Sequence, residues 1–419
     1  MTTIDGWTAP GFSAVADAFQ ANFDAGLEVG AAFAAYHRWE KVVDLWGGIA
    51  DQTTGKPWEE RSLVLVYSTT KGITAMCAHR LAQEGRLDVD APVVTYWPEF
   101  GAAGKESVTV ADLLAHRAGL AWVDGTMTFE EMARWDPVVE ALERQAPSWA
   151  PGTAHGYHAT TYGWLVGEVV RRISGKSVGA FLRDEIAGPL GADFFIGLPA
   201  AEEPRVARLV SFLDALAAGG GPGAGLQQAG LQRAGADGAE LAAMAELARS
   251  YLAPDGPLTK ALTAPGGVFH DETLWHEPAL RAAEIPAANG VCDARSLARL
   301  YGACVSDVPS VSGASLRVLS SSQVDRAVVQ QTEGPDRVLM GLDLQWGLGF
   351  IVNRGLTALA GLGGARSFGH FGMGGSAGWA DPDLELGMGY VMNRLALGTT
   401  GDTRSYRLMQ ACIAAAGAA

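Results

Sequence analysis

The chain of 419 residues contains four cysteines, 31 basic residues against 46 acidic ones, and no long uninterrupted apolar run. Because a helix needs about 20 apolar residues to cross a bilayer, no segment is predicted to span a membrane. The net charge of −15 and the lack of a basic cluster disfavour nucleic acid and anionic membrane surfaces as partners, since both repel an acidic protein. A neutral small molecule is the expected partner.

The cysteines lie far apart and match no metal-binding or redox spacing, so they are predicted to be buried free thiols. They are Cys77, Cys292, Cys304 and Cys412. His155 and His158 lack an acidic or thiol third ligand nearby, and we expect neither a metal nor a cofactor. Free thiols fit a reducing compartment, and residues 1–12 lack the basic start and apolar core of a signal peptide, so we expect a cytoplasmic protein.

Strand-like segments lie near both ends of the chain. An apolar hairpin is predicted over residues 30–48, and further strand-like runs lie at 345–352 and 386–392. Helices are predicted at 14–25 and 403–416. Strands from both ends with helices inserted between them predict an α+β fold, in which one sheet is flanked by helices and accompanied by a helical part.

The length of the chain leaves room for two domains. Residues 1–85 and 287–419 are predicted to form one discontinuous α/β sandwich domain, and residues 86–286 a mostly helical domain inserted into it. A Gly- and Ala-rich stretch at 217–238 has few large apolar residues and is predicted to be a surface excursion.

A Ser-x-x-Lys motif, from Ser68 to Lys71, stands at the start of a predicted helix that ends near Gly85. On the first turn of a helix, residues three apart share a face, so the amine of Lys71 can take a proton from the hydroxyl of Ser68. Backbone N–H groups at a helix start can also hold an oxyanion. The alternative interpretation is an N-cap serine followed by a solvated lysine.

Tyr157 lies on a glycine-framed loop before an amphipathic helix. A tyrosine next to a lysine can shuttle a proton, because the ammonium stabilises the phenolate. The alternative is a tyrosine that packs its ring and bonds a carbonyl. Earlier in the chain, Thr109 and Asp112 form a plausible helix cap, and His116 after them is predicted to hold a turn.

The stretch 368–382 is rich in glycine, which lets a substrate approach a strand edge closely. Within it, residues 374–378 match the Gly-x-Ser-x-Gly nucleophile elbow around Ser376. An elbow requires a helix directly after the serine, followed by an acidic residue and a histidine. Here a turn and a strand are predicted after the serine and no histidine follows His370, so we reject Ser376 as the nucleophile.

Three motifs together resemble those of the serine β-lactamase and penicillin-binding-protein superfamily: Ser68-x-x-Lys71, Tyr157 on its loop, and His370-x-Gly372 before a hairpin. The pattern is similar to that of the esterase branch, the family VIII carboxylesterases, which themselves resemble class C β-lactamases. The resemblance extends over residues 30–393. It implies a β-lactamase-like fold with an antiparallel sheet.

The resemblance also implies roles for individual residues. Ser68 would be the acylated nucleophile and Lys71 its activating base, while Tyr157 would share the base role and return the proton to the leaving group. The backbone N–H groups of Ser68 and Met373 would form the oxyanion hole. Water activated by the Tyr157 and Lys71 pair would then release the acid.

Two departures from the family's pattern bear on the substrate. Penicillin-recognising relatives usually have Tyr-x-Asn, whereas Ala159 stands in the asparagine position and offers no amide. They usually have Lys-Thr-Gly where this chain has His370, and a histidine is mostly neutral at pH 7. A neutral ester with a short apolar acyl group needs neither contact. The residues expected to bind it are His370, Phe371, Gly372, Trp346 and Trp379.

The predicted activity is therefore cleavage of short-chain carboxylic esters through an acyl-enzyme on Ser68. An amide-bond hydrolase or acyltransferase, such as a D-amino-acid peptidase or a weak β-lactamase, would use the same residues. A non-catalytic binding protein of the same superfamily is disfavoured, because the chain keeps Ser68, Lys71 and Tyr157 together.

Overall fold

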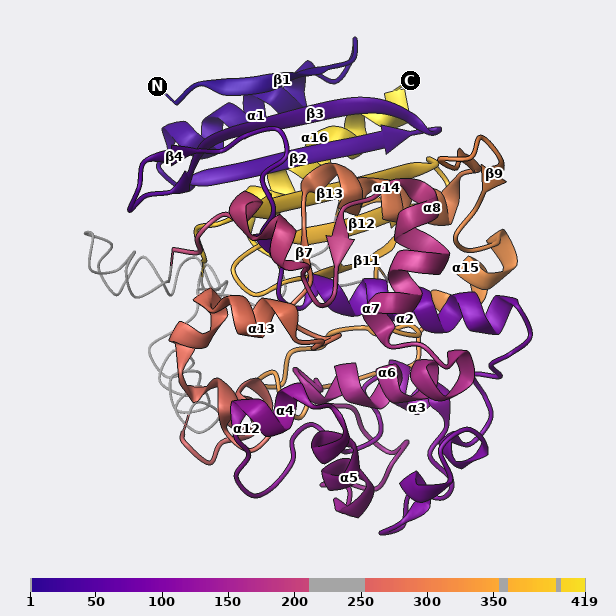
Figure 1. Cartoon of the computed structure of the whole chain (residues 1–419). Helices are drawn as coiled ribbons and strands as arrows, with labels where there is room; N and C mark the ends of the chain where they lie inside the picture. The colour runs from indigo at the N-terminus through magenta and orange to yellow at the C-terminus, as the bar shows by residue number, and fades with distance from the viewer. Residues whose placement is uncertain (1, 211–252, 354–360, 397–400, 419) are drawn as a thin grey trace, which may run out of the picture.

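The computed structural model describes residues 2–210, 253–353, 361–396 and 401–418. The predicted excursion at 217–238 lies outside these residues. One antiparallel sheet of eight strands is built from both ends of the chain (Figure 1), as predicted. Its strands lie in the order β1 (Ile4–Thr8), β3 (Glu40–Asp51), β2 (Gly30–His37), β13 (Leu386–Met392), β12 (Ala377–Asp381), β11 (Phe368–Phe371) and β10 (Ile351–Val352), and β4 (Lys56–Pro57) pairs with β3.

The two ends of the chain meet where β13 pairs with β2, in a register that runs from Leu386 opposite His37 to Met392 opposite Ala31. The side chain of Asn393, which is buried at the end of β13, fastens this junction. Its Oδ1 accepts the N–H of Gly30 at 2.9 Å, and its Nδ2 donates to two carbonyls of β3. The strand-like run at 345–352 is shorter than predicted, because only its last two residues form β10.

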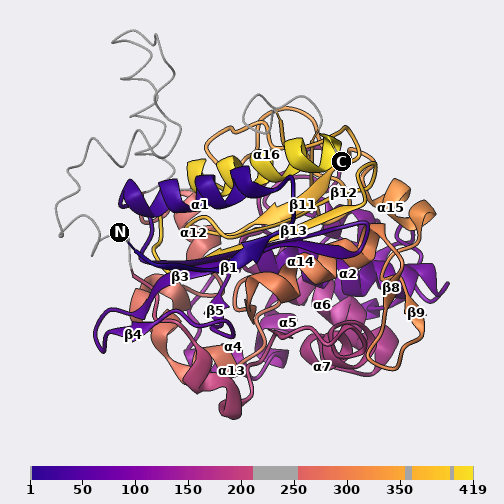
Figure 2. The ribbon, with the colours of Figure 1, turned by 90° about the horizontal axis from the view of Figure 1, so that it is seen from above.

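Helices cover both faces of the sheet (Figure 2). Helices α1 (Ser13–Asp24) and α16 (Thr403–Ala418) lie side by side on one face, which confirms the two predicted terminal helices. Helices α14 (Ala294–Val305) and α2 (Thr69–Gln83) lie on the other face. Helix α2 also packs against α6 (Thr161–Ser174), so it stands between the sheet and the helical part of the molecule.

The remaining elements belong mainly to the helical part below the sheet in Figure 1. The further α-helices are α3 (Val110–Leu114), α4 (Phe129–Ala133), α5 (Asp136–Arg144), α7 (Val178–Leu182), α8 (Gly188–Leu190), α12 (Pro257–Thr263), α13 (Pro278–Ala282) and α15 (Ser321–Ala327). A small sheet joins β5 (Val64–Leu65), β7 (Val291–Cys292) and β6 (Phe194–Phe195), and β8 (Val308–Pro309) pairs with β9 (Ser315–Leu316). The domain boundaries at residues 86 and 287 stay a prediction.

The four cysteines are buried and unpaired, as predicted. Over the described ranges, no helix is both long and apolar enough to cross a membrane.

Helix α14 lies unusually close to the sheet because the strands beneath it carry glycines. A Cβ atom added at Gly387 would lie 2.3 Å from the backbone N of Gly302, and one at Gly389 would lie 2.4 Å from the carbonyl O of Ala294. A Cβ at Gly378 would lie 2.2 Å from the ring of Tyr301. The backbone of the helix therefore rests on the backbone of the strands, and this close contact leaves no room for side chains.

We expect Gly387→Ala to destabilise the protein, because the added methyl group meets helix backbone that cannot rotate away. Overpacking of this kind costs about 1–3 kcal/mol. Gly417→Ala is the matched control, since a Cβ at this position near the end of α16 meets nothing within 4 Å. Urea unfolding of both variants measures the difference, and equal midpoints would contradict the packing argument.

Candidate active site

Ser68 stands at the first turn of α2, directly after β5 and a sharp bend at Tyr67. Tyr67 has a φ of 45°, which is an unfavourable conformation for a large side chain. Its ring packs edge-on against Trp275 at a centroid distance of 4.8 Å. Strained backbone of this kind persists only where the surroundings hold it, and it concentrates at functional sites. The bend places the Ser68 hydroxyl at the start of a buried helix.

The amine of Lys71 is fully buried and contacts three oxygen atoms from three separate parts of the chain. Its Nζ lies 3.0 Å from Ser68 Oγ, 2.6 Å from the carbonyl O of Ala159 and 2.9 Å from the carbonyl O of Ala287. Ser68 stands at the start of the same helix, Ala159 lies in the segment before α6, and Ala287 lies in the segment before β7. The predicted pairing of Ser68 with Lys71 is therefore present as a direct contact.

The two carbonyl groups determine where the lone pair of a neutral Lys71 amine points. A neutral amine has two N–H groups and one lone pair, and the two carbonyls accept both N–H groups. The lone pair is then left for the third neighbour, the hydroxyl of Ser68. Burial lowers the pKa of Lys71 well below its ordinary value, which favours this neutral form. Lys71 is thus arranged to accept the proton of Ser68.

Tyr157 lies next to this pair, with Lys71 Nζ 4.7 Å from the centroid of its ring. Burial raises the pKa of Tyr157, and the nearby Ser68 hydroxyl opposes this shift only in part. The phenol oxygen makes no hydrogen bond of good geometry to any described residue. Tyr157 is therefore a protonated phenol in the resting protein, a form that can donate a proton, and its share in the base role stays a prediction.

Asp336 fixes the backbone of Tyr157, and no sequence motif points to it. Its Oδ1 accepts the N–H of Tyr157 at 3.1 Å and those of Val338 and Leu339 at 2.7 Å each. Its Oδ2 lies 4.0 Å from Nε2 of His155. Burial raises the pKa of Asp336, although the three N–H groups favour its charged form. This buried carboxyl group joins the tyrosine loop to the segment that precedes β10.

The neighbouring histidines hold the tyrosine loop. His158 uses both ring nitrogens, since Nδ1 donates to the Gly156 carbonyl at 2.7 Å and Nε2 accepts the N–H of Leu120 at 3.0 Å. His116, with a φ of 60°, accepts the backbone N–H of His158 on Nδ1 at 3.1 Å. The prediction that His116 holds a turn is confirmed. Through these contacts, His116 and His158 hold the backbone of the tyrosine loop in place.

His370 and Trp346, two of the predicted substrate-binding residues, lie beside Tyr157. The ring of Trp346 stacks on Tyr157 at 5.7 Å, and its centroid lies 5.6 Å from that of His370. Burial lowers the pKa of His370 to about 3, and a protonated Lys71 would lower it further. His370 is therefore neutral, and with Nδ1 donating to the Phe371 carbonyl at 2.7 Å it offers an acceptor on Nε2.

Phe371 and Trp379 pack away from Ser68, so their predicted place in the substrate pocket is wrong. Successive side chains of a strand point to opposite faces, so Phe371 points away from the face that carries His370. It stacks on Trp379 at 5.5 Å and packs against Tyr406 of α16. The indole of Trp379 donates to the carbonyl of Leu362 at 3.0 Å. Both rings belong to the core under α16.

The glycine-rich loop between β11 and β12 lies against the turn that carries Ser68. A Cβ added at Gly372 would lie 2.2 Å from the carbonyl O of Val66, so this contact requires glycine. Ser376 Oγ donates to the same carbonyl at 2.9 Å and lies 2.9 Å from Thr69 Oγ1. Strand β12 begins at the next residue, so the helix that a nucleophile elbow needs is missing, as expected. The buried Ser376 hydroxyl fastens the loop, in which Met373 directly follows Gly372.

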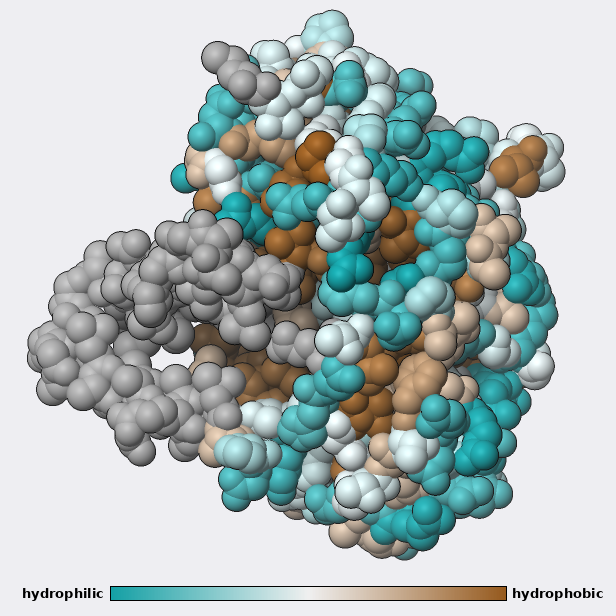
Figure 3. All heavy atoms as spheres, turned by 60° about the vertical axis from the view of Figure 1, so that its left-hand side comes forward, coloured by the Kyte–Doolittle hydropathy of each residue, from teal (hydrophilic) through white to brown (hydrophobic). Residues whose placement is uncertain are grey.

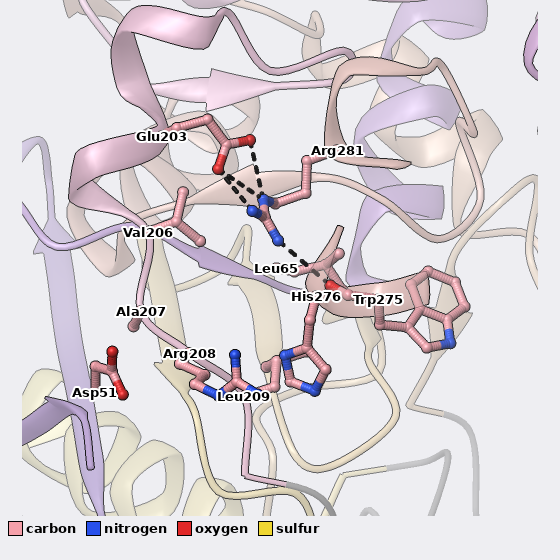
Figure 4. A pocket seen from close by; sticks show the side chains of 10 residues that line it. All are labelled: Asp51, Leu65, Glu203, Val206, Ala207, Arg208, Leu209, Trp275, His276 and Arg281. Atoms are coloured by element: carbon pink, nitrogen blue, oxygen red, sulfur yellow. Dashed lines mark hydrogen bonds and ion pairs between the residues drawn. The ribbon is translucent and has the colours of Figure 1, made fainter. Parts of the chain in front are cut away.

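Two hollows on the molecule lie apart from Ser68. The hollow drawn in Figure 4 measures about 120 Å³ and lies beside β5, where Arg281 pairs with Glu203 at 2.6 Å. The other, of about 340 Å³, lies over α4 and α5. In Figure 3, apolar surface is gathered across the middle of the face shown, between polar regions above and below.

An antiparallel sheet from both chain ends, with Ser-x-x-Lys at the start of a central buried helix, is the arrangement of the serine β-lactamases and penicillin-binding proteins. The model of the Beta-lactamase family matches residues 19–412. The chain belongs to this family.

Known proteins resemble the chain over nearly its whole length. The Esterase/beta-lactamase LipL of Mycobacterium tuberculosis is 35% identical over 94% of this chain and 83% of its own. A solved family VIII carboxylesterase superposes with a TM-score of 0.81 at 36% identity, covering 99% of this chain and 100% of that one. A penicillin-binding protein homolog from Caulobacter crescentus has a TM-score of 0.79 at 34% identity, with the same coverage. The resemblance stated from the motifs is thereby confirmed.

We expect the rate of ester cleavage to depend on the neutral form of Lys71. Because burial lowers the pKa of this amine, kcat/KM should fall as the pH drops through that lowered pKa, and should reach its plateau well below the ordinary lysine range near pH 10. The profile of kcat/KM against pH, measured with an uncharged ester, checks this. A profile that begins to rise only near pH 10 would show that Lys71 carries its charge at neutral pH.

We expect Asp336→Ala to lower kcat about tenfold or more with a smaller effect on KM, because the backbone of Tyr157 loses its fixed position. Asp336→Asn keeps one acceptor oxygen and should lie between this variant and the natural protein. Asp343→Ala, which removes an exposed carboxylate nearby, is the control. Steady-state kinetics with an ester distinguish the three, and a loss confined to KM would disprove the positioning role.

Proposed function

We propose that this serine hydrolase of the β-lactamase fold cleaves esters through an acyl-enzyme on Ser68. The observation that carries the proposal is the contact of Lys71 Nζ with Ser68 Oγ at 3.0 Å, while two backbone carbonyls accept both N–H groups of the neutral amine. The similarity to LipL and to a family VIII carboxylesterase supports ester substrates.

In the acylation step, the neutral amine of Lys71 takes the proton of Ser68, and Oγ attacks the carbonyl carbon of the ester. The resulting oxyanion is held by the backbone N–H groups of Ser68 and Met373. The C–O bond to the alcohol then breaks, and the alcohol leaves with a proton from Tyr157, which Lys71 replaces. This assignment fits a buried phenol that is protonated at rest.

In the deacylation step, a water molecule attacks the acyl-enzyme. The Tyr157 and Lys71 pair takes one proton from the water, the C–O bond to Ser68 breaks, and Ser68 regains a proton as the acid leaves. No metal or cofactor is needed for either step.

The substrates we propose are neutral esters with short apolar acyl groups. A carboxylate on the substrate would find no cation at His370, which is neutral because of its burial. An acylamino group would find Ala159 in place of a side-chain amide. Trp346 supplies an apolar surface next to Tyr157. We also propose a cytoplasmic location, which the four free thiols support.

A second candidate is an amide-bond hydrolase or acyltransferase that uses the same residues. The similarity to a penicillin-binding protein homolog and the double name of LipL favour this possibility. A third possibility, a non-catalytic binding protein, is disfavoured by the contact between Lys71 and Ser68.

The test compares p-nitrophenyl butyrate, nitrocefin and a D-alanyl-D-alanine peptide as substrates of the natural protein and of Ser68→Ala. We expect rapid cleavage of the ester, slow turnover of the other two, and loss of ester cleavage by at least about a thousandfold in Ser68→Ala, because the covalent route is removed. Dominant nitrocefin or peptide turnover would favour the second candidate.

A fluorophosphonate probe locates the nucleophile directly. It should label Ser68 in the natural protein and also in Ser376→Ala, whose missing hydroxyl only loosens the loop. Labelling that disappears in Ser376→Ala and persists in Ser68→Ala would refute the assignment, and a protein that the probe does not label at all would favour the binding protein.

A further inference from the structure

A buried charged cluster lies behind the loop that carries Met373. Its centre is Arg404 in the first turn of α16, which is 3% exposed. The guanidinium pairs with Asp402 at 2.6 Å and with Glu28 at 3.2 Å, and Glu28 also contacts the hydroxyl of Tyr390. The reaction proposed above involves none of these groups directly, so the cluster requires another explanation.

The guanidinium of Arg404 reaches backbone as well as carboxylates. Nη2 donates to the carbonyl O of Gly374 at 2.5 Å, and Nη1 donates to that of Arg394 at 2.9 Å. Nε donates to Asp402 Oδ2 at 2.9 Å. A guanidinium has five N–H groups in one rigid plane, so its direction is fixed once several of them are bound. Arg404 thus presents one N–H group in a defined direction to the loop.

The loop needs such a contact because its two glycines can adopt many backbone conformations. Gly374 has a φ of 87° and Gly375 a φ of 123°. Glycine has no Cβ, so sterics alone do not hold it in this conformation. The carbonyl of Gly374 receives the Arg404 N–H group and also the N–H of Ala396 at 3.2 Å. A Cβ added at Gly375 would lie 2.7 Å from Arg404 Nη2, so glycine is also what lets the guanidinium approach.

We propose that Arg404 is a positioning residue for the oxyanion hole. Arg404 holds the carbonyl of the peptide between Gly374 and Gly375. The N–H of that same peptide donates to the carbonyl O of Gly372 at 3.1 Å. Because the Gly372 carbonyl shares its peptide with the N–H of Met373, this chain of contacts aims that N–H at the developing oxyanion. This inference rests on the proposed function, because Met373 has this task only if Ser68 is acylated. The Ser376 contacts fasten the loop on its other side, toward Val66 and Thr69.

Stability alone does not explain a buried arginine at this place. Burying an ion pair removes both charges from water, and an apolar replacement of similar volume is often as stable. A guanidinium differs from an apolar group in the direction of its N–H donors. Arg404 directs one of its donors at the Gly374 carbonyl, whose peptide in turn contacts the peptide that carries the proposed oxyanion donor.

The test is Arg404→Lys, with Arg407→Lys as the matched control on an exposed position of the same helix. Lysine keeps the charge, but its single nitrogen cannot reproduce the planar set of donors. We expect kcat for p-nitrophenyl butyrate to fall about 10- to 100-fold with KM within about threefold, and the affinity for phenylboronic acid to fall by the same factor as kcat/KM. The boronate adduct of a serine places an oxygen where the oxyanion forms.

A second variant keeps the test decisive if Arg404→Lys fails to fold. Asp402→Asn keeps Oδ1, which caps α16 by accepting the N–H groups of Arg404 and Ser405, and it removes the charged oxygen that orients the guanidinium. We expect the same pattern of lower kcat and weaker boronate binding, at a thermal midpoint that permits assay at 25 °C.

The outcomes separate the two proposals. Natural-protein values of kcat and boronate affinity in folded Arg404→Lys or Asp402→Asn would overturn the role of Arg404, and so would a loss confined to KM. Failure of the fluorophosphonate probe to label Ser68 in the natural protein would instead overturn the proposed function. A specific loss in both variants, with Arg407→Lys unchanged, would support the positioning role.

Discussion

The site depends on one nitrogen atom, Lys71 Nζ, at which three distant parts of the chain meet. Ser68 belongs to the same helix, whereas the carbonyls of Ala159 and Ala287 come from segments before α6 and β7. A buried amine must have its N–H groups bonded, since an unsatisfied one costs about 1–3 kcal/mol. The hydrogen bonds of this amine therefore hold the helical part, the segment before the small sheet and Ser68 in one arrangement. The same bonds turn the lone pair of the amine toward the Ser68 hydroxyl.

Burial also controls the charge of the site. The pKa of His158 is lowered to about 4 and that of His370 to about 3, in both cases mainly because the rings are removed from water. A protonated Lys71 would lower both pKa values further. The imidazoles around Ser68 are therefore neutral, and the site has no permanent cation opposite an incoming substrate. An apolar, uncharged acyl group has the lowest free-energy cost of burial in such surroundings.

Much of the fold and the core of the site could be predicted, and what could not be predicted has a physical cause. Residues that act through side chains at short spacing, such as Ser68 and Lys71, leave a motif in the sequence. Carbonyl groups such as that of Ala159 leave none, because every residue has one. The positions of Asp336 and Phe371 are set by tertiary contacts, which no local pattern reveals. Asp336 bonds the backbone of Tyr157, which is far away in the sequence, and Phe371 packs under α16, the helix that covers its face of the sheet.

The contact of Arg404 with Gly374 has a consequence for the newly made protein. During synthesis the nucleophile emerges first, the tyrosine loop and the carbonyl of Ala287 follow, and α16 emerges after all of them. The glycine-rich loop gains its guanidinium contact only when that helix docks beside α1. A nascent chain can thus expose Ser68 without a finished catalytic pocket, and the ability to hydrolyse arrives as a late event of maturation.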